Sequence, residues 1–239
     1  EDESDPIFFI NDLLPHLGAD QNKKTLAEGV TGESLNIIVG HSSFGIDDKE
    51  NPIKKLVLQF LNEKYNLIEE DFQVAEFEVV PAAKARDVGF DRAMIAGHGH
   101  DDRICSYANL EAILEVENPE ITAVGLFVDK EEIGSVGNAS MSAKFFENFV
   151  AEVLATRENY SDIKLRRAMS NSKVLSADVT AALDPNHKDV MDDKNAAIVG
   201  FGVTMSKYTG ARGKSGSNDA NAEYIAQLRD LFKEENVIW

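Results

Sequence analysis

Short apolar runs with strand character alternate with segments of helical periodicity along much of this chain. The run at residues 121–128 lies between two such helical segments, at 104–115 and 140–156. It contains no charged side chain, which is typical of a strand buried on both faces. Helices that alternate with doubly buried strands cover the faces of a sheet. The pattern therefore predicts an α/β fold with a sheet that carries helices on its faces.

The first third of the chain has the pattern of a smaller α/β unit. Pro52 opens a helical segment that continues to about residue 65, with apolar side chains every three or four positions. A polar, Gly-bounded connection at 81–89 marks the expected boundary between a domain at 1–88 and a domain at 89–239. The other expected elements are strands at 36–40, 75–79, 174–179 and 196–205, a Gly-rich flexible loop at 210–217 and a helix at 218–235.

The charge balance limits the classes of partner. The 239 residues carry 24 Lys and Arg against 42 Asp and Glu, a formal net charge of −18. Nucleic-acid binding and docking on anionic lipid both need clustered basic side chains, so we expect neither partner. No apolar stretch is long enough to span a bilayer. With 43% hydrophobic residues, the composition is that of a globular protein.

The single cysteine, Cys105, excludes an intrachain disulfide framework and favours a reducing, cytoplasmic location. The first residues lack a signal-peptide pattern. The last three, 237–239, resemble a strand that is just beginning, so we expect the chain to be a portion of a longer protein. We expect the thiol of Cys105 to be buried and inert.

Three acidic segments stand at helix starts or strand ends, at 98–103, 129–135 and 176–178. Ligands of open α/β sheets bind outside the carboxyl ends of strands. Adjacent glutamates there, Glu131 and Glu132, repel one another unless a positive group lies between them, which a divalent metal ion would supply. Each segment also has a structural explanation, since aspartates cap helices and acidic residues occupy solvated turns.

These segments resemble the metal-site motifs of a known family. The sequences His100-Asp-Asp-Arg-Ile-Cys-Ser106, Val128-Asp-Lys-Glu-Glu-Ile-Gly-Ser135 and Ser176-Ala-Asp178 are similar to those of the aspartyl aminopeptidase and vacuolar aminopeptidase I family of dinuclear zinc exopeptidases. Residues 8–17 resemble the start of that family's inserted dimerisation domain. The resemblance covers essentially the whole chain. It implies a zinc-exopeptidase-like mixed sheet with helices on both faces, plus a smaller inserted α/β dimerisation domain at 1–88.

The resemblance also assigns roles to individual residues. Asp101 would bridge the two metal ions, Glu132 would bind one ion and Asp178 would bind the other. Glu131 would be the general base that deprotonates the attacking water. The peptide bond between Asp101 and Asp102 would be cis. The cofactor would be two zinc ions, with cobalt or manganese as alternatives, and the substrate-binding residues remain unassigned.

The chain departs from the family pattern in its histidines. The family's two metal-binding histidines lie in segments outside this stretch, so each ion would keep two protein carboxylates, fewer than catalytic zinc usually has. His98 or His100 would substitute for a missing ligand, or both are ordinary loop histidines. We therefore expect the 239-residue chain alone to bind zinc weakly and to have little activity.

The resemblance thus implies that the chain is the central part of a metallo-aminopeptidase that removes N-terminal residues from peptides with a water activated by two metal ions. The catalytic domain, 89–239, would be incomplete at its C-terminus, and residues before about 88 would form a homo-oligomer through an apolar interface. The alternative is a non-catalytic acidic protein, either an oligomeric scaffold or a divalent-cation-binding module, because the same carboxylates suit calcium or magnesium.

Overall fold

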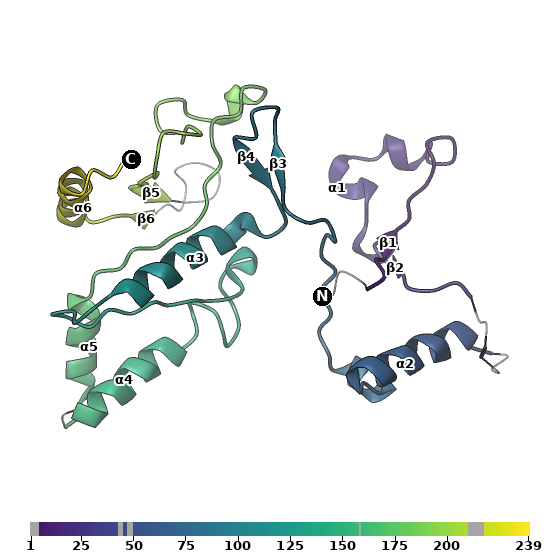
Figure 1. The fold of residues 1–239 in the computed structure, drawn as a ribbon, viewed down its shortest axis with the longest axis horizontal. Helices are drawn as coiled ribbons and strands as arrows, with labels where there is room; N and C mark the ends of the chain where they lie inside the picture. The colour runs from purple at the N-terminus through teal and green to yellow at the C-terminus, as the bar shows by residue number, and fades with distance from the viewer. Residues whose placement is uncertain (1–4, 43–44, 47–49, 158, 210–217) are drawn as a thin grey trace. The chain divides into compact units, whose positions relative to one another are not determined.

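The computed structural model describes residues 5–42, 45–46, 50–157, 159–209 and 218–239 (Figure 1). The expected flexible loop at 210–217 lies outside the described residues. The chain forms two compact units, Glu1–His98 and Gly99–Trp239. The described residues contain helices and small sheets, so the fold is α/β. The expected division at residue 88 and the assignment of a dimerisation domain stay predictions.

The first unit contains one long helix. Strand β1 (Phe9–Ile10) pairs antiparallel with β2 (Ile37–Ile38), and the short helices η1 (Gln21–Lys23), α1 (Leu26–Gly29) and η2 (Gly32–Ser34) lie between them in the chain. Helix α2 (Pro52–Tyr65) confirms the helix expected at 51–65. It ends at Asn66, which is left-handed: the Asn66 N–H donates to the Asn62 carbonyl and the Leu67 N–H donates to the Leu61 carbonyl.

Two predictions for this unit need correction. The strand expected at 75–79 is absent among the described residues, and the chain there follows η3 (Glu69–Gln73) without a ladder partner. Phe77 from this stretch stacks on Phe72 with ring centroids 4.7 Å apart. The connection expected at 81–89 is partly strand, since β3 (Arg86–Val88) pairs antiparallel with β4 (Met94–Ala96). Alternation of side chains alone does not make a strand, because a strand also needs a paired neighbour.

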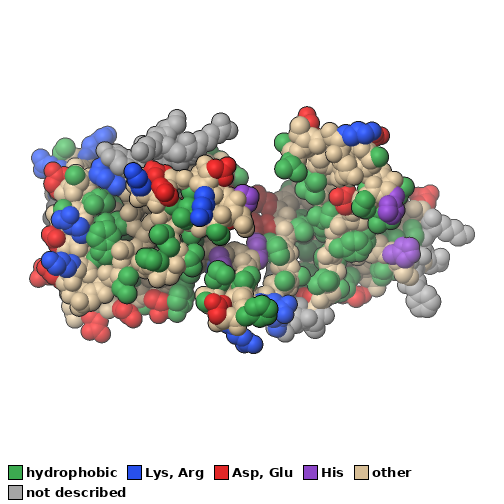
Figure 2. Space-filling model, turned by 90° about the horizontal axis from the view of Figure 1, so that it is seen from above, with side chains coloured by type: hydrophobic (Ala, Val, Ile, Leu, Met, Phe, Trp, Pro, Cys, Tyr) green, Lys and Arg blue, Asp and Glu red, His purple; other side chains and the backbone are tan. Residues whose placement is uncertain are grey.

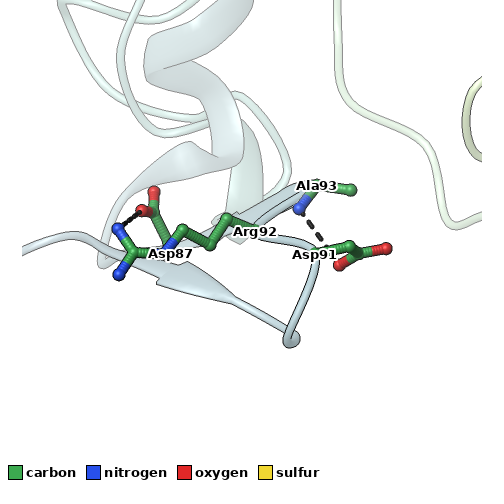
Figure 3. A network of polar contacts seen from close by, with 4 residues as sticks. All are labelled: Asp87, Asp91, Arg92 and Ala93. Atoms are coloured by element: carbon green, nitrogen blue, oxygen red, sulfur yellow. Dashed lines mark hydrogen bonds and ion pairs between the residues drawn. The ribbon is translucent and has the colours of Figure 1, made fainter.

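The β3–β4 hairpin is closed by its own polar side chains (Figure 3). Arg92 reaches back to Asp87 of β3, with 3.3 Å between Nη1 and Oδ2. The Asp91 carboxylate accepts a hydrogen bond from the Ala93 backbone N–H at 3.2 Å. Gly89, at a φ of 86°, supplies the left-handed residue that this turn requires.

Most of the regular secondary structure described in the second unit is helical. It contains α3 (His100–Glu115), η4 (Glu131–Ile133), α4 (Phe145–Arg157), α5 (Asp162–Asn171), η5 (Lys188–Val190) and α6 (Ala222–Glu234), with β5 (Tyr208–Thr209) antiparallel to β6 (Asn218–Asp219). Two expected helices start later than the sequence suggests. The helix expected from 140 begins at Phe145, and the one expected from 218 begins at Ala222, after Asn221 caps it.

The larger sheet predicted for this unit is not formed among the described residues. The described sheets are three antiparallel pairs of two strands each. The strands expected at 121–128, 174–179 and 196–205 run as irregular chain instead. Among the described residues, pairing in this region consists of an isolated parallel bridge between Ala182 and Ala197, with a hydrogen bond from the Leu183 N–H to the Ala197 carbonyl, and a hydrogen bond from the Val203 N–H to the Ile238 carbonyl. Apolar runs of strand character stay unpaired when no neighbouring strand is present.

Few side chains of the described residues are buried. Leu165 is the buried apolar side chain and Ser140 the buried polar one. Apolar side chains lie across the visible surface among charged ones (Figure 2). Among the described residues, no helix is both long enough and apolar enough to cross a bilayer.

Candidate metal site

The start of α3 has an irregular backbone that presents two consecutive aspartates. Gly99, the residue before the helix, has a φ of 77°, and a Cβ there would lie 2.3 Å from Nη1 of Arg103. Asp101 and Asp102 have non-helical angles, and the peptide bond between them is cis, as the family resemblance implies. The Arg103 backbone N–H donates to the Gly99 carbonyl at 3.3 Å, so the first turn is closed despite the irregularity.

The segment 121–128 brings a second set of acidic residues toward the start of α3. It runs back alongside the helix after the chain leaves α3 (Figure 1). Gly125 lies against Ile113, and the Asn109 side-chain amide donates to the Leu126 carbonyl at 3.5 Å. Because the segment is antiparallel to α3, residues beyond 128 approach the N-terminal end of the helix.

The chain then makes a tight turn that carries Glu131 and Glu132. Lys130 before the turn and Gly134 after it are both left-handed, at φ values of 69° and 95°. Gly134 N–H donates to the Glu131 carbonyl, and Ser135 N–H donates to the Lys130 carbonyl, each at 2.8 Å. These bonds hold η4 as a single turn with both glutamates on it.

Three aspartates converge at the start of α3. One carboxylate oxygen from each of Asp101, Asp102 and Asp178 lies within 4.8 Å of the other two. Asp178 comes from the extended stretch 174–179, and its carboxylate accepts a hydrogen bond from the Val179 N–H at 2.7 Å. The structure therefore brings two of the expected metal ligands, Asp101 and Asp178, to one place.

Glu132 joins this cluster through Asp101. The Glu132 carboxyl group interacts electrostatically with those of Asp101 and Asp178. The negative charge of Asp101, followed by that of Glu131, raises the pKa of Glu132 above its ordinary value. Protonation of Glu132 would reduce the repulsion between the two carboxylates. A bound cation would relieve the same repulsion.

The donor set fits a divalent metal ion. The Oδ1 atom of Asp102 is buried and, among the described residues, has no hydrogen-bond partner. A buried acceptor without a donor is costly, and a cation beside it would satisfy it. All the converging atoms are carboxylate oxygens, which zinc, manganese and magnesium accept as ligands.

Asp102 belongs to this candidate group, although the motifs alone assigned it no ligand role. Its adjacency to the expected bridging residue Asp101 was the available signal. Cys105, one turn further along α3, is half-buried, and its thiol lies close to Asp102. Burial, and then the interaction with Asp102 and the carboxylate charges of Asp102, Asp178 and Asp101, raise the pKa of Cys105 to about 11. The thiol is therefore protonated and unreactive at neutral pH.

The assembled aspartate group contains no histidine among the described residues. His100 is exposed as the first residue of α3, and His98 lies just before Gly99. A ligand role for either histidine stays a hypothesis, as do the individual roles of Glu131, Glu132, Asp101 and Asp178.

A family model described as aminopeptidase I zinc metalloprotease (M18) matches residues 1–238. The chain belongs to the M18 peptidase family. Three M18 relatives, each named probable M18 family aminopeptidase 1, align over nearly the whole chain. The relative from Clostridium acetobutylicum is 48% identical over 239 residues, and those from Thermotoga maritima and Borreliella burgdorferi are 45% and 43% identical over 236 and 244 aligned residues.

Solved M18 structures have the same fold. A crystal structure of the M18 aminopeptidase from Thermotoga maritima matches 98% of the chain at 43% identity with a TM-score of 0.88. That of aminopeptidase I from Clostridium acetobutylicum matches 100% of the chain at 48% identity with a TM-score of 0.85. The chain spans about half the length of the curated M18 relatives it matches, 51% to 53%.

Proposed function

We propose that the full-length protein is a metallo-aminopeptidase that removes N-terminal residues from peptides. The observation that carries this proposal is the convergence of Asp101, Asp102, Asp178 and Glu132 beside the turn that holds Glu131. Membership of a zinc metalloprotease family supports the same reaction class. The finer assignment, to aspartyl and vacuolar-type aminopeptidases, rests on the motif resemblance.

The proposed roles follow from where the side chains lie. Asp101 is close to both Glu132 and Asp178, so it would suit a bridging role between two ions while the other two bind one ion each. Two zinc ions in this position would act as Lewis acids toward water and the scissile carbonyl. Glu131, beside these carboxylates, would accept the proton of the attacking water and pass it to the leaving amine.

The remaining ligands would come from outside the described group. Carboxylates from this chain supply two ligands per ion in this scheme, and catalytic zinc usually has three protein ligands. In the full-length protein, histidines from other segments would complete each ion, with cobalt or manganese as alternatives to zinc. The chain alone would then bind metal weakly.

The same proposal extends to the fold and assembly. In the full-length protein, the unpaired segments 121–128, 174–179 and 196–205 would join a mixed sheet with helices on both faces. Residues before about 88 would form the dimerisation domain of a homo-oligomer. The net charge of −18 supports a peptide partner over nucleic acid or an anionic membrane, and the single cysteine supports a cytoplasmic location.

A non-catalytic divalent-cation module is the second candidate. The observation that favours it is the all-oxygen donor set, which also suits calcium or magnesium. Such a module would bind a hard cation at Asp101, Asp102 and Asp178 and would not need Glu131.

Substitution of Glu131 separates the two candidates. In the full-length protein, Glu131→Gln should lower kcat by about 10²- to 10⁴-fold, the usual contribution of a general base, and leave the metal content unchanged. Glu33, an exposed glutamate in the 3₁₀ helix η2 of the first unit, provides the matched control as Glu33→Gln. Unchanged turnover in Glu131→Gln, or no peptidase activity in the wild type, would reject the proposed reaction.

A further inference from the structure

Ser140 is fully buried in a loop whose neighbouring side chains are exposed. Its side chain has 0% relative accessibility, whereas Met141 next to it is 52% exposed. Within the described chain, the other buried side chain is that of Leu165. The contacts of its hydroxyl, described next, are to residues of the same loop.

The hydroxyl of Ser140 binds the loop to itself. Its Oγ donates to the Gly137 carbonyl at 2.8 Å, and it lies 3.1 Å from the Oγ of Ser142. Ser142 in turn donates to the Ser135 carbonyl. Each hydroxyl has one hydrogen, so two of these three contacts are hydrogen bonds at any time. We call Ser140 and Ser142 the serine clamp.

The clamped carbonyls follow directly after the turn that carries Glu131 and Glu132. Backbone bonds close the same loop, from Asp129 N–H to the Ala139 carbonyl at 3.0 Å and from Ser135 N–H to the Lys130 carbonyl at 2.8 Å. Backbone hydrogen bonds therefore join the two ends of the loop, at Asp129 and Ala139, and the serine clamp holds the carbonyls of Ser135 and Gly137 within it.

Two non-glycine residues of this loop have backbone conformations that side-chain-bearing residues rarely adopt. Lys130 and Ser135 have φ values of 69° and 57°, whereas the other two positive-φ positions, Gly134 and Gly137, are glycines, which adopt this region readily. The conformations of Lys130 and Ser135 persist only where surrounding interactions fix them. If the clamp is lost, the Gly137 carbonyl loses its donor and the turn relaxes toward ordinary backbone angles.

We propose that Ser140, together with Ser142, is a positioning residue that holds the Glu131–Glu132 turn in the geometry needed at Asp101. The inference rests on the proposed function, because that function gives the turn its catalytic base. The clamp touches neither substrate nor the reacting atoms. It acts through the loop backbone and fixes the direction in which the two glutamates leave it.

The test uses Ser140→Ala in the full-length protein. Ser172→Ala is the matched control, because Ser172 also donates to a backbone carbonyl, that of Ala168, at 2.8 Å at the end of helix α5. In Ser140→Ala, kcat should fall about tenfold with KM unchanged, as expected when the base is displaced but substrate binding is kept. Ser140→Cys, with a similar size and a weak S–H donor, should recover part of the loss.

A second readout does not depend on activity. In the metal-free protein, amide hydrogen exchange of the Asp129 and Ser135 N–H groups should be about tenfold faster in Ser140→Ala and unchanged in Ser172→Ala. Ser142→Ala, a change at an exposed side chain, should give a smaller change in the same direction. This variant keeps the test valid if Ser140→Ala fails to fold.

The outcomes separate the inference from the proposed function. Activity retained in Glu131→Gln would reject the catalytic role of the turn, whatever Ser140→Ala does. If Glu131→Gln is inactive, equal kcat values in Ser140→Ala and Ser172→Ala would overturn the positioning role. Unchanged exchange of the two amides in both clamp variants would overturn the clamp itself.

Discussion

The loop at residues 129–143 and the segment just before it, 121–128, are formed by different means. The loop is closed by hydrogen bonds between residues at most ten positions apart. Within the described chain, segment 121–128 makes no backbone–backbone hydrogen bond, and it contacts α3 through Gly125 and Leu126. A turn is thus determined by nearby residues, whereas a strand depends on partners distant in the sequence.

Exposure separates the two regions in the same way. Ser140 of the loop is fully buried, whereas Ile121 and Val124 of the segment are 81% and 50% exposed. Large apolar side chains at this density are normally covered in a native protein. The segment therefore has the composition of a sheet strand without the neighbours of one.

The largest effect is expected from a charge placed in the segment. Val124 and Val30 are about equally exposed, at 50% and 53%. If 121–128 is a covered strand in the full-length protein, Val124→Asp buries an unpaired charge and should cost more than about 4 kcal/mol. Val30→Asp, at the end of α1, should stay within about 1 kcal/mol of wild type. Soluble yield and thermal unfolding measure the stability of the two variants. Equal losses of stability in Val124→Asp and Val30→Asp would show that Val124 is no more covered than Val30.

The next effect concerns the cluster of carboxylates. The raised pKa of Cys105, about 11 against an ordinary 9.0, means that at pH 8 its thiolate population is about 100-fold lower than that of an unperturbed thiol. In metal-free protein, iodoacetamide should alkylate Cys105 about 100-fold more slowly than in the denatured protein. Asp102→Asn should accelerate the reaction, because it removes a negative charge. A native rate equal to the denatured rate would mean that the thiol is neither buried nor close to the aspartates.

The sign of the accompanying stability change follows from the same shift. Because the folded-state pKa of Cys105 is raised, its protonated form stabilises the native state at pH values below the unfolded pKa near 9. That contribution is lost as the pH rises toward 11. The stability difference between wild type and Cys105→Ser should therefore shrink between about pH 9 and pH 11, as measured by urea unfolding.

A smaller effect is expected where the segment meets α3. A Cβ on Gly125 would lie 3.3 Å from Cγ2 of Ile113, tighter than ordinary contact. Gly125→Ala should therefore cost about 1–3 kcal/mol of stability. Gly32 provides the control as Gly32→Ala, because a Cβ on Gly32 would meet no atom within 4 Å. This control should change stability by less than about 1 kcal/mol. Equal melting temperatures for the two variants would mean that the segment does not pack on α3.

The smallest effect tests a purely local interaction. The Asn221 side chain accepts a hydrogen bond from the Tyr224 N–H at 2.9 Å and caps α6. Asn221→Ala should cost about 1 kcal/mol, measured by urea unfolding. Asn171→Ala, at the C-terminal end of α5, is the control and should have almost no effect. An equal loss of stability in Asn171→Ala would contradict the capping role of Asn221.

The sequence could predict the features that depend on neighbouring residues. Helix α2 was expected from its apolar period and from Pro52, and its observed range agrees closely. The strands at 121–128 and 174–179 were expected from composition alone, and that composition says nothing about which segment pairs with them. Their pairing could not be derived from the residues themselves.

The candidate site also contains residues that sequence motifs indicate and residues that only the three-dimensional structure reveals. Asp101, Glu132 and Asp178 were chosen from short motifs, and the structure brings them together. Asp102 and the serine clamp were missed, because their importance depends on burial and on backbone geometry. A buried Oδ1 without a donor and a serine with no exposed surface are visible only in three dimensions.

Anomalous scattering at the zinc edge, measured on crystals of the full-length protein, tests the central claim most directly. The expected result is two peaks about 3.5–4 Å apart with the Asp101 carboxylate between them, the spacing of two-metal sites. Glu132 should contact one peak, and Asp178 the other. Peaks remote from Asp101, or none beside Glu132 and Asp178 in an active enzyme, would contradict the assignment of these carboxylates as metal ligands.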